Sequence, residues 1–205
     1  MQKVLIPVFK FEELSEEVKA KVREAHYEFL SEIGDITEQV TDFYTYRLQE
    51  LNYPVENINW SLSYCQGDGM AFYGPLYTET LVKLRDRLMP GSGRSLPVTF
   101  FEEYVTMTIK SNNSHYDHYN SMSIELDLYR DISPKKQEAL NAFILRLKVD
   151  IKNTSQTLER EGYNYLEAMR EPEYLDEGIK AQESMYYIDG EVLRHTFETC
   201  LECIA

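Results

Sequence analysis

The sequence predicts an α+β fold, in which helices pack on an antiparallel β-sheet. Residues 57–64 alternate apolar and polar side chains, as a strand with one buried face does. Residues 98–109 and 119–128 are both rich in β-forming residues, and a Ser-Asn-Asn-Ser turn separates them. After Pro134 the apolar residues recur at helical spacing, which predicts a long amphipathic helix.

The N-terminal part predicts one strand and two helices. Residues 4–11 are mostly apolar and suit a short strand at a sheet edge. Ser15 is placed to cap a helix that ends at Gly34, and a second helix follows and stops before Pro54. The apolar stripe of the first helix consists of Val18, Val22, Ala25, Phe29 and Ile33.

The middle of the chain predicts a strand at 70–73, a helix at 78–88 and then the β-rich pair. The apolar residues have odd numbers in the first strand of that pair and even numbers in the second. Residues that face each other across the hairpin must therefore have numbers whose sum is odd. The loop must then hold an even number of residues, and 111–114 fits best. This register places Tyr116 and His118 on the same inward face as Met107.

The C-terminal part predicts mainly helices. The long helix begins at Ser133 and is broken by Gly162, because glycine is a poor helix former. Two shorter helices are expected at 163–169 and 173–181. A terminal hairpin is expected over residues 184–194, with its two-residue turn at Asp189-Gly190.

Composition points to one globular domain spanning residues 1–205. The hydrophobic content is 43%, and Lys plus Arg number 21 against 35 Asp plus Glu, which gives a net charge of −14. Such a protein repels phosphate backbones, so direct nucleic-acid binding is not expected. The charge would suit a protein that covers a basic, nucleic-acid-binding surface of another protein, even by mimicking nucleic acid. The simpler interpretation is solubility.

The sequence also predicts a cytoplasmic protein that does not associate with a membrane. It contains no apolar run long enough to span a bilayer, and its N-terminal stretch does not resemble a signal peptide. The cysteines, Cys65, Cys200 and Cys203, form no regular disulfide framework, which suits a reducing compartment. A zinc site would need partners beyond the CxxC pair, so no metal and no cofactor are predicted.

Side chains suited to acid–base chemistry gather in two turns, the stretch QGDG at 66–69 and the stretch HYDH at 115–118. Because both lie in or beside turns of adjacent strands, we expect them to meet at one edge of the sheet. The candidate functional side chains are Gln66, Asp68, His115, His118 and Glu103.

The glycines of the first turn have two interpretations. Gly67 and Gly69 can supply the positive φ angles of a hairpin loop placed between Cys65 and Met70. Alternatively, they let backbone N–H groups approach a ligand, with the side chains of Gln66 and Asp68 as contacts.

Three chemical alternatives involve the second turn. One of Glu102 and Glu103 should point inward in an otherwise apolar strand, and a buried carboxylate needs a partner such as His118. The two histidines could also act as a general base or as metal ligands beside Asp68, or they could be structural, one near the turn and one packed in the core. Cys65 could act as a nucleophile with His115 as its base, but it lacks the flanking residues of known cysteine nucleophiles. No catalytic residue is assigned, and binding is favoured over catalysis.

These motifs resemble a mostly uncharacterised group of small phage and prophage proteins, some described as antitoxins of toxin–antitoxin stability systems. Four stretches in the same order carry the resemblance: Phe11–Arg23, with its "ELs–aKekAr" pattern, Ser63–Phe72 with "SQGDGasF", Ser114–His118 with "GHYxH", and Leu158–Leu166 followed by Tyr186–Gly190. The chain departs from the group at Cys65, where serine is usual, and at Ser114, where glycine is usual.

The resemblance implies a phage-borne accessory protein with the QGDG and HYDH turns as its distinctive surface. We therefore expect a protein that binds a bacterial host protein, as a counter-defence factor or an antitoxin-like inhibitor, and its sixteen tyrosines would suit an interface. The alternative is a small enzyme or ligand-binding protein whose pocket uses Gln66, Asp68, His115 and His118, with Glu103.

Overall fold

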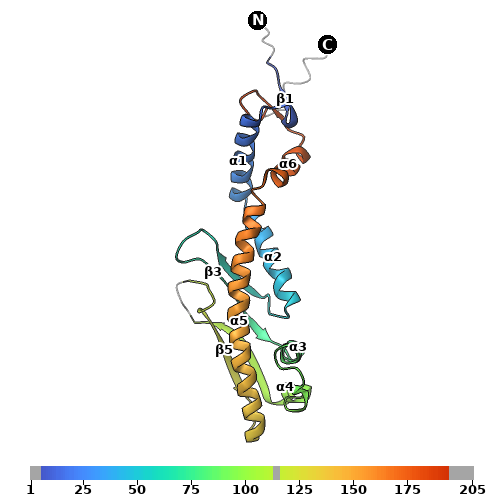
Figure 1. The fold of residues 1–205 in the computed structure, drawn as a ribbon, viewed down its shortest axis with the longest axis vertical. Helices are drawn as coiled ribbons and strands as arrows, with labels where there is room; N and C mark the ends of the chain where they lie inside the picture. Colours follow the sequence, from blue (N-terminus) through green and yellow to red (C-terminus); the bar gives the residue numbers. More distant parts are fainter. Residues whose placement is uncertain (1–5, 113–115, 194–205) are drawn as a thin grey trace. The chain divides into compact units, whose positions relative to one another are not determined.

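The computed structural model describes residues 6–112 and 116–193 and confirms the α+β class (Figure 1). Its strands form a two-stranded and a four-stranded sheet, both antiparallel. The chain makes two compact units: unit 1 takes its two ends, up to Glu38 and from Leu166, and unit 2 is Gln39–Tyr165. Whether residues 1–205 fold as one domain, as the sequence predicts, stays a prediction.

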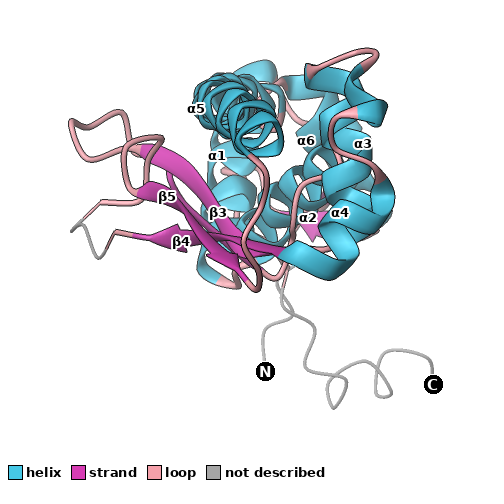
Figure 2. Cartoon of the chain, turned by 90° about the horizontal axis from the view of Figure 1, so that it is seen from below, coloured by secondary structure: helices cyan, strands magenta, loops and turns pink. Residues whose placement is uncertain are grey.

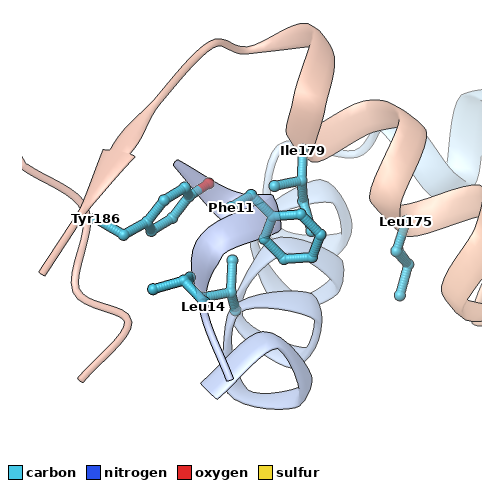
Figure 3. Packing of buried hydrophobic residues seen from close by; sticks show 6 residues of the cluster. Phe11, Leu14, Leu175, Ile179 and Tyr186 are labelled. Carbon is cyan, nitrogen blue, oxygen red and sulfur yellow. The ribbon is translucent and has the colours of Figure 1, made fainter. Parts of the chain in front are cut away.

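Unit 1 combines β1 (Phe9–Lys10), α1 (Glu16–Glu32), α6 (Pro172–Ala181) and β6 (Met185–Tyr186), with β1 paired antiparallel to β6. The strand expected at 4–11 is shorter, because a 3₁₀ turn begins at Phe11. The buried side chains of its core, several of them shown in Figure 3, are Phe11, Leu14, Val22, Leu175, Ile179 and Tyr186.

The helices of unit 1 follow the sequence signals only in part. Ser15 caps α1, since its hydroxyl accepts a hydrogen bond from the Val18 backbone N–H at 3.4 Å. Val18 and Val22 pack on the core, but Ala25, Phe29 and Ile33 are exposed, so the predicted stripe is wrong in its second half. A periodic apolar pattern shows which face could be buried, and a packing partner decides how much of it is.

The terminal hairpin is present as a single bridge. Tyr186 pairs with Val192, and the Tyr187 N–H donates to the Glu191 carbonyl at 2.8 Å. Gly190 has a φ of +95°, so the predicted turn places its glycine in the left-handed region. Arg194, where the hairpin was expected to end, lies outside the described residues.

Unit 2 contains the larger sheet, with strands in the order β2 (Asn57–Ser61), β3 (Gly69–Leu76), β4 (Val105–Ser111) and β5 (Met122–Leu128). Burial alternates along β4, where Val105, Met107 and Ile109 are buried and the residues between them are exposed or half-buried. Helices lie along one side of this sheet (Figure 2). They are α2 (Asp35–Glu50), α3 (Thr78–Leu88), α4 (Val98–Tyr104) and α5 (Pro134–Ala168).

The β4–β5 hairpin confirms the parity predicted from the sequence and corrects the loop. Met107 pairs with Leu126 and Ile109 with Ile124, so the index sum is odd. The strands separate after the pair of Ser111 with Met122, so the loop is not 111–114, and Tyr116 and His118 lie in the loop rather than on the inward strand face with Met107. The apolar alternation determines parity, but loops that differ by two residues preserve it equally well.

The segment 98–109 is only half strand, because its first part forms α4. Phe100 and Phe101 on this helix are buried, while Glu102 and Glu103 are exposed. The expectation of an inward carboxylate paired with His118 is therefore wrong. On a helix the two glutamates can both face solvent, whereas neighbours on a strand point to opposite faces.

Gly162 does not break the long helix, and α5 continues through it to Ala168. A Cβ at this position would lie 1.9 Å from the Tyr44 hydroxyl oxygen and 2.8 Å from Leu62 Cδ1. Glycine is therefore present because α2 and the end of β2 approach α5 closely here. None of the helices in the described residues is long and apolar enough to cross a bilayer.

Candidate functional site

The β2–β3 loop, residues 62–68, is organised around the carboxylate of Asp68. Oδ2 accepts hydrogen bonds from the backbone N–H of Ser63 at 2.7 Å, from that of Cys65 at 2.9 Å, and from the Tyr163 hydroxyl on α5. Oδ1 accepts from the Ser61 hydroxyl at 3.2 Å and from the Cys65 thiol at 3.1 Å. One carboxylate thus ties both ends of the loop to each other and to α5.

These hydrogen bonds determine the charge of Asp68. Burial opposes ionisation, but the hydrogen bonds from Tyr163, Cys65 and Ser63 outweigh it and hold the pKa of Asp68 well below its ordinary value. Burial, together with the hydrogen bond to Asp68, raises the pKa of Tyr163. Near neutral pH Asp68 is therefore an ionised acceptor and Tyr163 a protonated donor.

Tyr64 occupies the strained position of the loop. Its φ is +56°, which is unusual for a bulky residue, and its side chain is 68% exposed. The ring packs on Tyr163 with a centroid distance of 4.6 Å. The interpretation in which Gly67 and Gly69 supply positive φ angles is wrong, because the left-handed residue of this loop is Tyr64 and neither glycine has positive φ.

The two glycines instead allow the second turn to approach. A Cβ on Gly67 would lie 2.6 Å from Tyr116 Cε1, and one on Gly69 would lie 2.6 Å from the Asp117 carbonyl oxygen and 2.9 Å from His118 Cα. The expectation that the two turns meet is therefore confirmed for residues 116–118. His115 lies outside the described residues. We call residues 62–69 together with 116–121 the double turn.

The second half of the double turn has its own hydrogen-bond network. The His118 N–H donates to the Ser121 hydroxyl oxygen at 3.0 Å, and the Asn120 N–H donates to His118 Nδ1 at 3.0 Å. Nδ1 is thus an acceptor, which assigns the proton of the neutral ring to Nε2. Ser121 is fully buried, so it forms the base of this turn.

Asp117 connects the second turn to the sheet. Its Oδ1 accepts from the Tyr73 hydroxyl on β3 at 2.7 Å, and its Oδ2 accepts from the Asn59 amide on β2 at 3.2 Å. Burial raises the pKa of Tyr73, with Asp117 as a further cause and the hydrogen bonds to Ser121 and Ser111 as opposing ones. Tyr73 therefore remains a donor, and the turn is fixed to two strands.

Glu159 on α5 is a member of this neighbourhood that sequence reasoning missed. Burial raises its pKa, the charge of Asp68 raises it further, and His118 lowers it. Glu159 therefore lies near both halves of the double turn. Its spacing from Tyr163, one helical turn along α5, puts both on one helix face and is the signal that could have found them.

The other predicted site residues take little part in the hydrogen-bond network of the double turn. Gln66 is exposed at the tip of the first turn. Glu103 is exposed on α4, and within the described chain no hydrogen bond or ion pair joins it to the double turn. In the described residues no group of three or more His, Cys, Asp or Glu side chains is arranged to hold a metal ion.

The chemistry of the double turn is that of a braced surface. Asp68 and Asp117 both accept hydrogen bonds that hold the turns, and the Cys65 thiol donates to the Asp68 carboxylate. Tyr64 and Tyr116, 68% and 50% exposed, are the large side chains presented outward.

Comparison of the chain with protein-family models, with curated proteins and with solved structures finds no match. The resemblance to phage and prophage proteins therefore stays an expectation, and the arguments below rest on geometry and charge.

Proposed function

We propose that the protein is a phage-encoded accessory protein that acts in the cytoplasm of a bacterial host by binding a host protein. Its activity would be that of a counter-defence factor or an antitoxin-like inhibitor. The phage origin rests on the sequence resemblance, and the binding activity rests on the double turn.

The observation that carries the proposal is the presentation of Tyr64 and Tyr116 on braced backbone. A left-handed tyrosine persists only where its surroundings fix it, and here Asp68 and Tyr163 do so. Tyr116 lies against Gly67, so its position is coupled to the same loop. Exposed tyrosines on rigid backbone make good interface anchors, because little conformational entropy is lost when they bind.

The net charge of −14 indicates the kind of target. An acidic protein associates fastest with a partner that presents a positive surface, and it repels other acidic proteins. A host protein with a basic surface, such as one that handles nucleic acid, fits both the charge and the tyrosines.

The test is capture of a host partner by the full chain, followed by two substitutions. Tyr64→Ala and Tyr116→Ala should each weaken capture about tenfold or more, the loss expected for an aromatic anchor. Tyr77→Ala is the matched control, since Tyr77 is 64% exposed but lies outside the double turn. Capture that survives both substitutions, or that Tyr77→Ala weakens equally, would show that the double turn is not the binding surface.

A small enzyme or ligand-binding protein is the second candidate. Glu159 favours it, because an acid whose pKa is raised lies near both Asp68 and the half-buried His118. Its site would add Gln66 and His115. Thermal-shift measurements with a panel of small metabolites test it: a stabilising compound should lose its effect in Glu159→Gln and His118→Gln.

A further inference from the structure

The strand β5 forms one edge of the larger sheet. The order β2-β3-β4-β5 leaves β5 with one neighbour, and no strand of the described residues pairs with its other side. An unpaired edge presents backbone N–H and C=O groups that another chain can bond.

The alternation of hydrogen bonds in the β4–β5 hairpin shows which backbone N–H and C=O groups of β5 are unpaired. At one end of the ladder the Asn112 N–H donates to the Ser121 carbonyl at 2.8 Å, and at the other the Tyr129 N–H donates to the Tyr104 carbonyl at 3.1 Å. Bonded pairs alternate in an antiparallel ladder, so Ser123, Glu125 and Asp127 bond to β4. The backbone groups of Met122, Ile124 and Leu126 therefore point to the outer edge.

A groove of about 300 Å³ runs between this edge and α5. Its strand side includes Met122 and Ile124, and its helix side includes Lys148, Ile151 and Lys152. Ile151 is buried and closes the bottom, whereas both lysines are exposed. The groove thus combines an apolar floor, unpaired strand backbone and two ammonium groups.

The charge of the groove is opposite to that of the protein. No side chain that lines it is acidic, although the chain as a whole carries −14. Neither Lys148 nor Lys152 forms an ion pair with a described residue, and the Lys152 ammonium lies 4.5 Å from the centroid of the Tyr119 ring. Two cations that no described carboxylate neutralises, beside a strand edge, favour an anionic occupant.

We propose that β5 binds an extended acidic segment of a partner protein, which adds to the sheet as a further strand. The added strand bonds the backbone of Met122, Ile124 and Leu126, and alternate side chains face α5, where their carboxylates meet Lys148 and Lys152. Its other face lies beside Glu125 and Asp127 and so carries neutral residues. The groove adjoins the double turn through Tyr119 and Asn120, but neither Tyr64 nor Tyr116 lines it, so the proposal stands whether or not those two tyrosines bind a protein.

The probe is a short fluorescent peptide that alternates glutamate with threonine, added to the full chain. Fluorescence polarisation measures binding of the peptide, which should weaken as the salt concentration is raised. Amide hydrogen exchange at Ile124 and Leu126 should slow when the peptide is bound. A peptide with lysine in place of glutamate should not bind.

Charge reversals locate the site. Lys148→Glu and Lys152→Glu should each weaken binding roughly threefold to tenfold. Lys135→Glu is the matched control, because Lys135 is exposed on the first turn of α5 and does not line the groove. Tyr64→Ala and Tyr116→Ala should leave peptide binding unchanged, which separates this proposal from the proposed function.

Four outcomes would overturn the proposal. They are no binding of the acidic peptide, equal loss in Lys135→Glu, binding without protection of the β5 amides, and amide protection that rises with protein concentration alone. The third would indicate a simple anion site, which inorganic phosphate would then occupy with the same lysine dependence. The fourth would indicate pairing of β5 with a second copy of the chain.

Discussion

The turn at Asp189-Gly190 in unit 1 and the loop ending at Asp68-Gly69 in unit 2 contain the same residue pair for different reasons. Gly190 has a φ of +95°, which any other residue would adopt only with strain. Gly69 has no such φ, but a Cβ there would lie 2.6 Å from the Asp117 carbonyl oxygen. Gly190 is required by its own backbone, with Val18 and Val22 also close to an added Cβ, whereas Gly69 is required by its neighbours alone.

The same contrast separates two helix glycines. Gly34 follows α1 with a φ of +82° and has nothing within 4 Å of an added Cβ. Gly162 lies inside α5 with Tyr44 against it. A sequence shows that glycine is present but not which constraint retains it, and substitutions distinguish the two.

The largest effect is expected for Gly162→Ala, which should lower the free energy of unfolding by about 3 kcal/mol. The new methyl group would lie 1.9 Å from the Tyr44 hydroxyl oxygen, and this outweighs the roughly 1 kcal/mol by which alanine favours a helix. Urea denaturation measures the loss. Tyr44→Phe should be nearly neutral alone, because the buried hydroxyl has no described partner, and should restore part of the stability of Gly162→Ala. Wild-type stability of Gly162→Ala would contradict the close approach.

Gly67→Ala and Gly69→Ala should each cost about 2 kcal/mol, but only the first should be rescued. The Gly67 methyl group meets the ring of Tyr116, so adding Tyr116→Ala should recover most of the loss. The Gly69 methyl group meets His118 Cβ and backbone atoms of Asp117 and His118, and all of these atoms remain in His118→Ala. A double-mutant cycle measured by thermal unfolding checks this, and rescue of Gly69→Ala by His118→Ala would contradict it.

Asp68→Asn should lower stability at neutral pH by about 1–2 kcal/mol, since the carboxylate accepts several hydrogen bonds near the surface. The folded-state pKa of Asp68 lies below its ordinary value of 3.8, so its stabilisation is present above pH 3.8 and is lost as the pH falls through the folded pKa. Unfolding curves of both proteins from pH 7 downward should therefore converge in acid. A difference that is constant with pH would show that Asp68 acts by shape alone.

The smallest effect is expected for Gly34→Ala, about 1 kcal/mol, because only backbone strain opposes it. Gly34→Asn should recover part of this, as asparagine tolerates the left-handed region. Thermal unfolding measures both. If asparagine is no better than alanine here, the constraint at Gly34 is not its backbone conformation.

Local signals predicted much of the fold. The helix at 78–88 is confirmed as α3 with Leu81 and Leu84 buried, and the parity of the β4–β5 pair is confirmed as well. These features depend on periodicity within one segment or between two neighbouring ones. The pairing of β1 with β6 joins segments from opposite ends of the chain, and no local sequence pattern predicts it.

The candidate site shows where prediction stops. The sequence identified Asp68 and His118 and the meeting of their turns, but not Tyr163 or Glu159 on α5. It also predicted strand where α4 forms, because aromatic and β-branched residues favour strands until packing decides otherwise. In both errors the chemical character of the residues was read correctly. What was missed is which distant segment of the chain packs against them.

Replacement of Tyr64 by glycine should change the stability of the fold very little. Glycine at this position would relieve about 1–2 kcal/mol of left-handed strain and would lose the packing on Tyr163, a contact of about 0.5–1.5 kcal/mol. The two terms nearly cancel, so the fold gains little by keeping a tyrosine there. Tyr64→Gly should therefore leave a folded protein of nearly unchanged stability, in which the proposed binding of a host protein can be tested by itself.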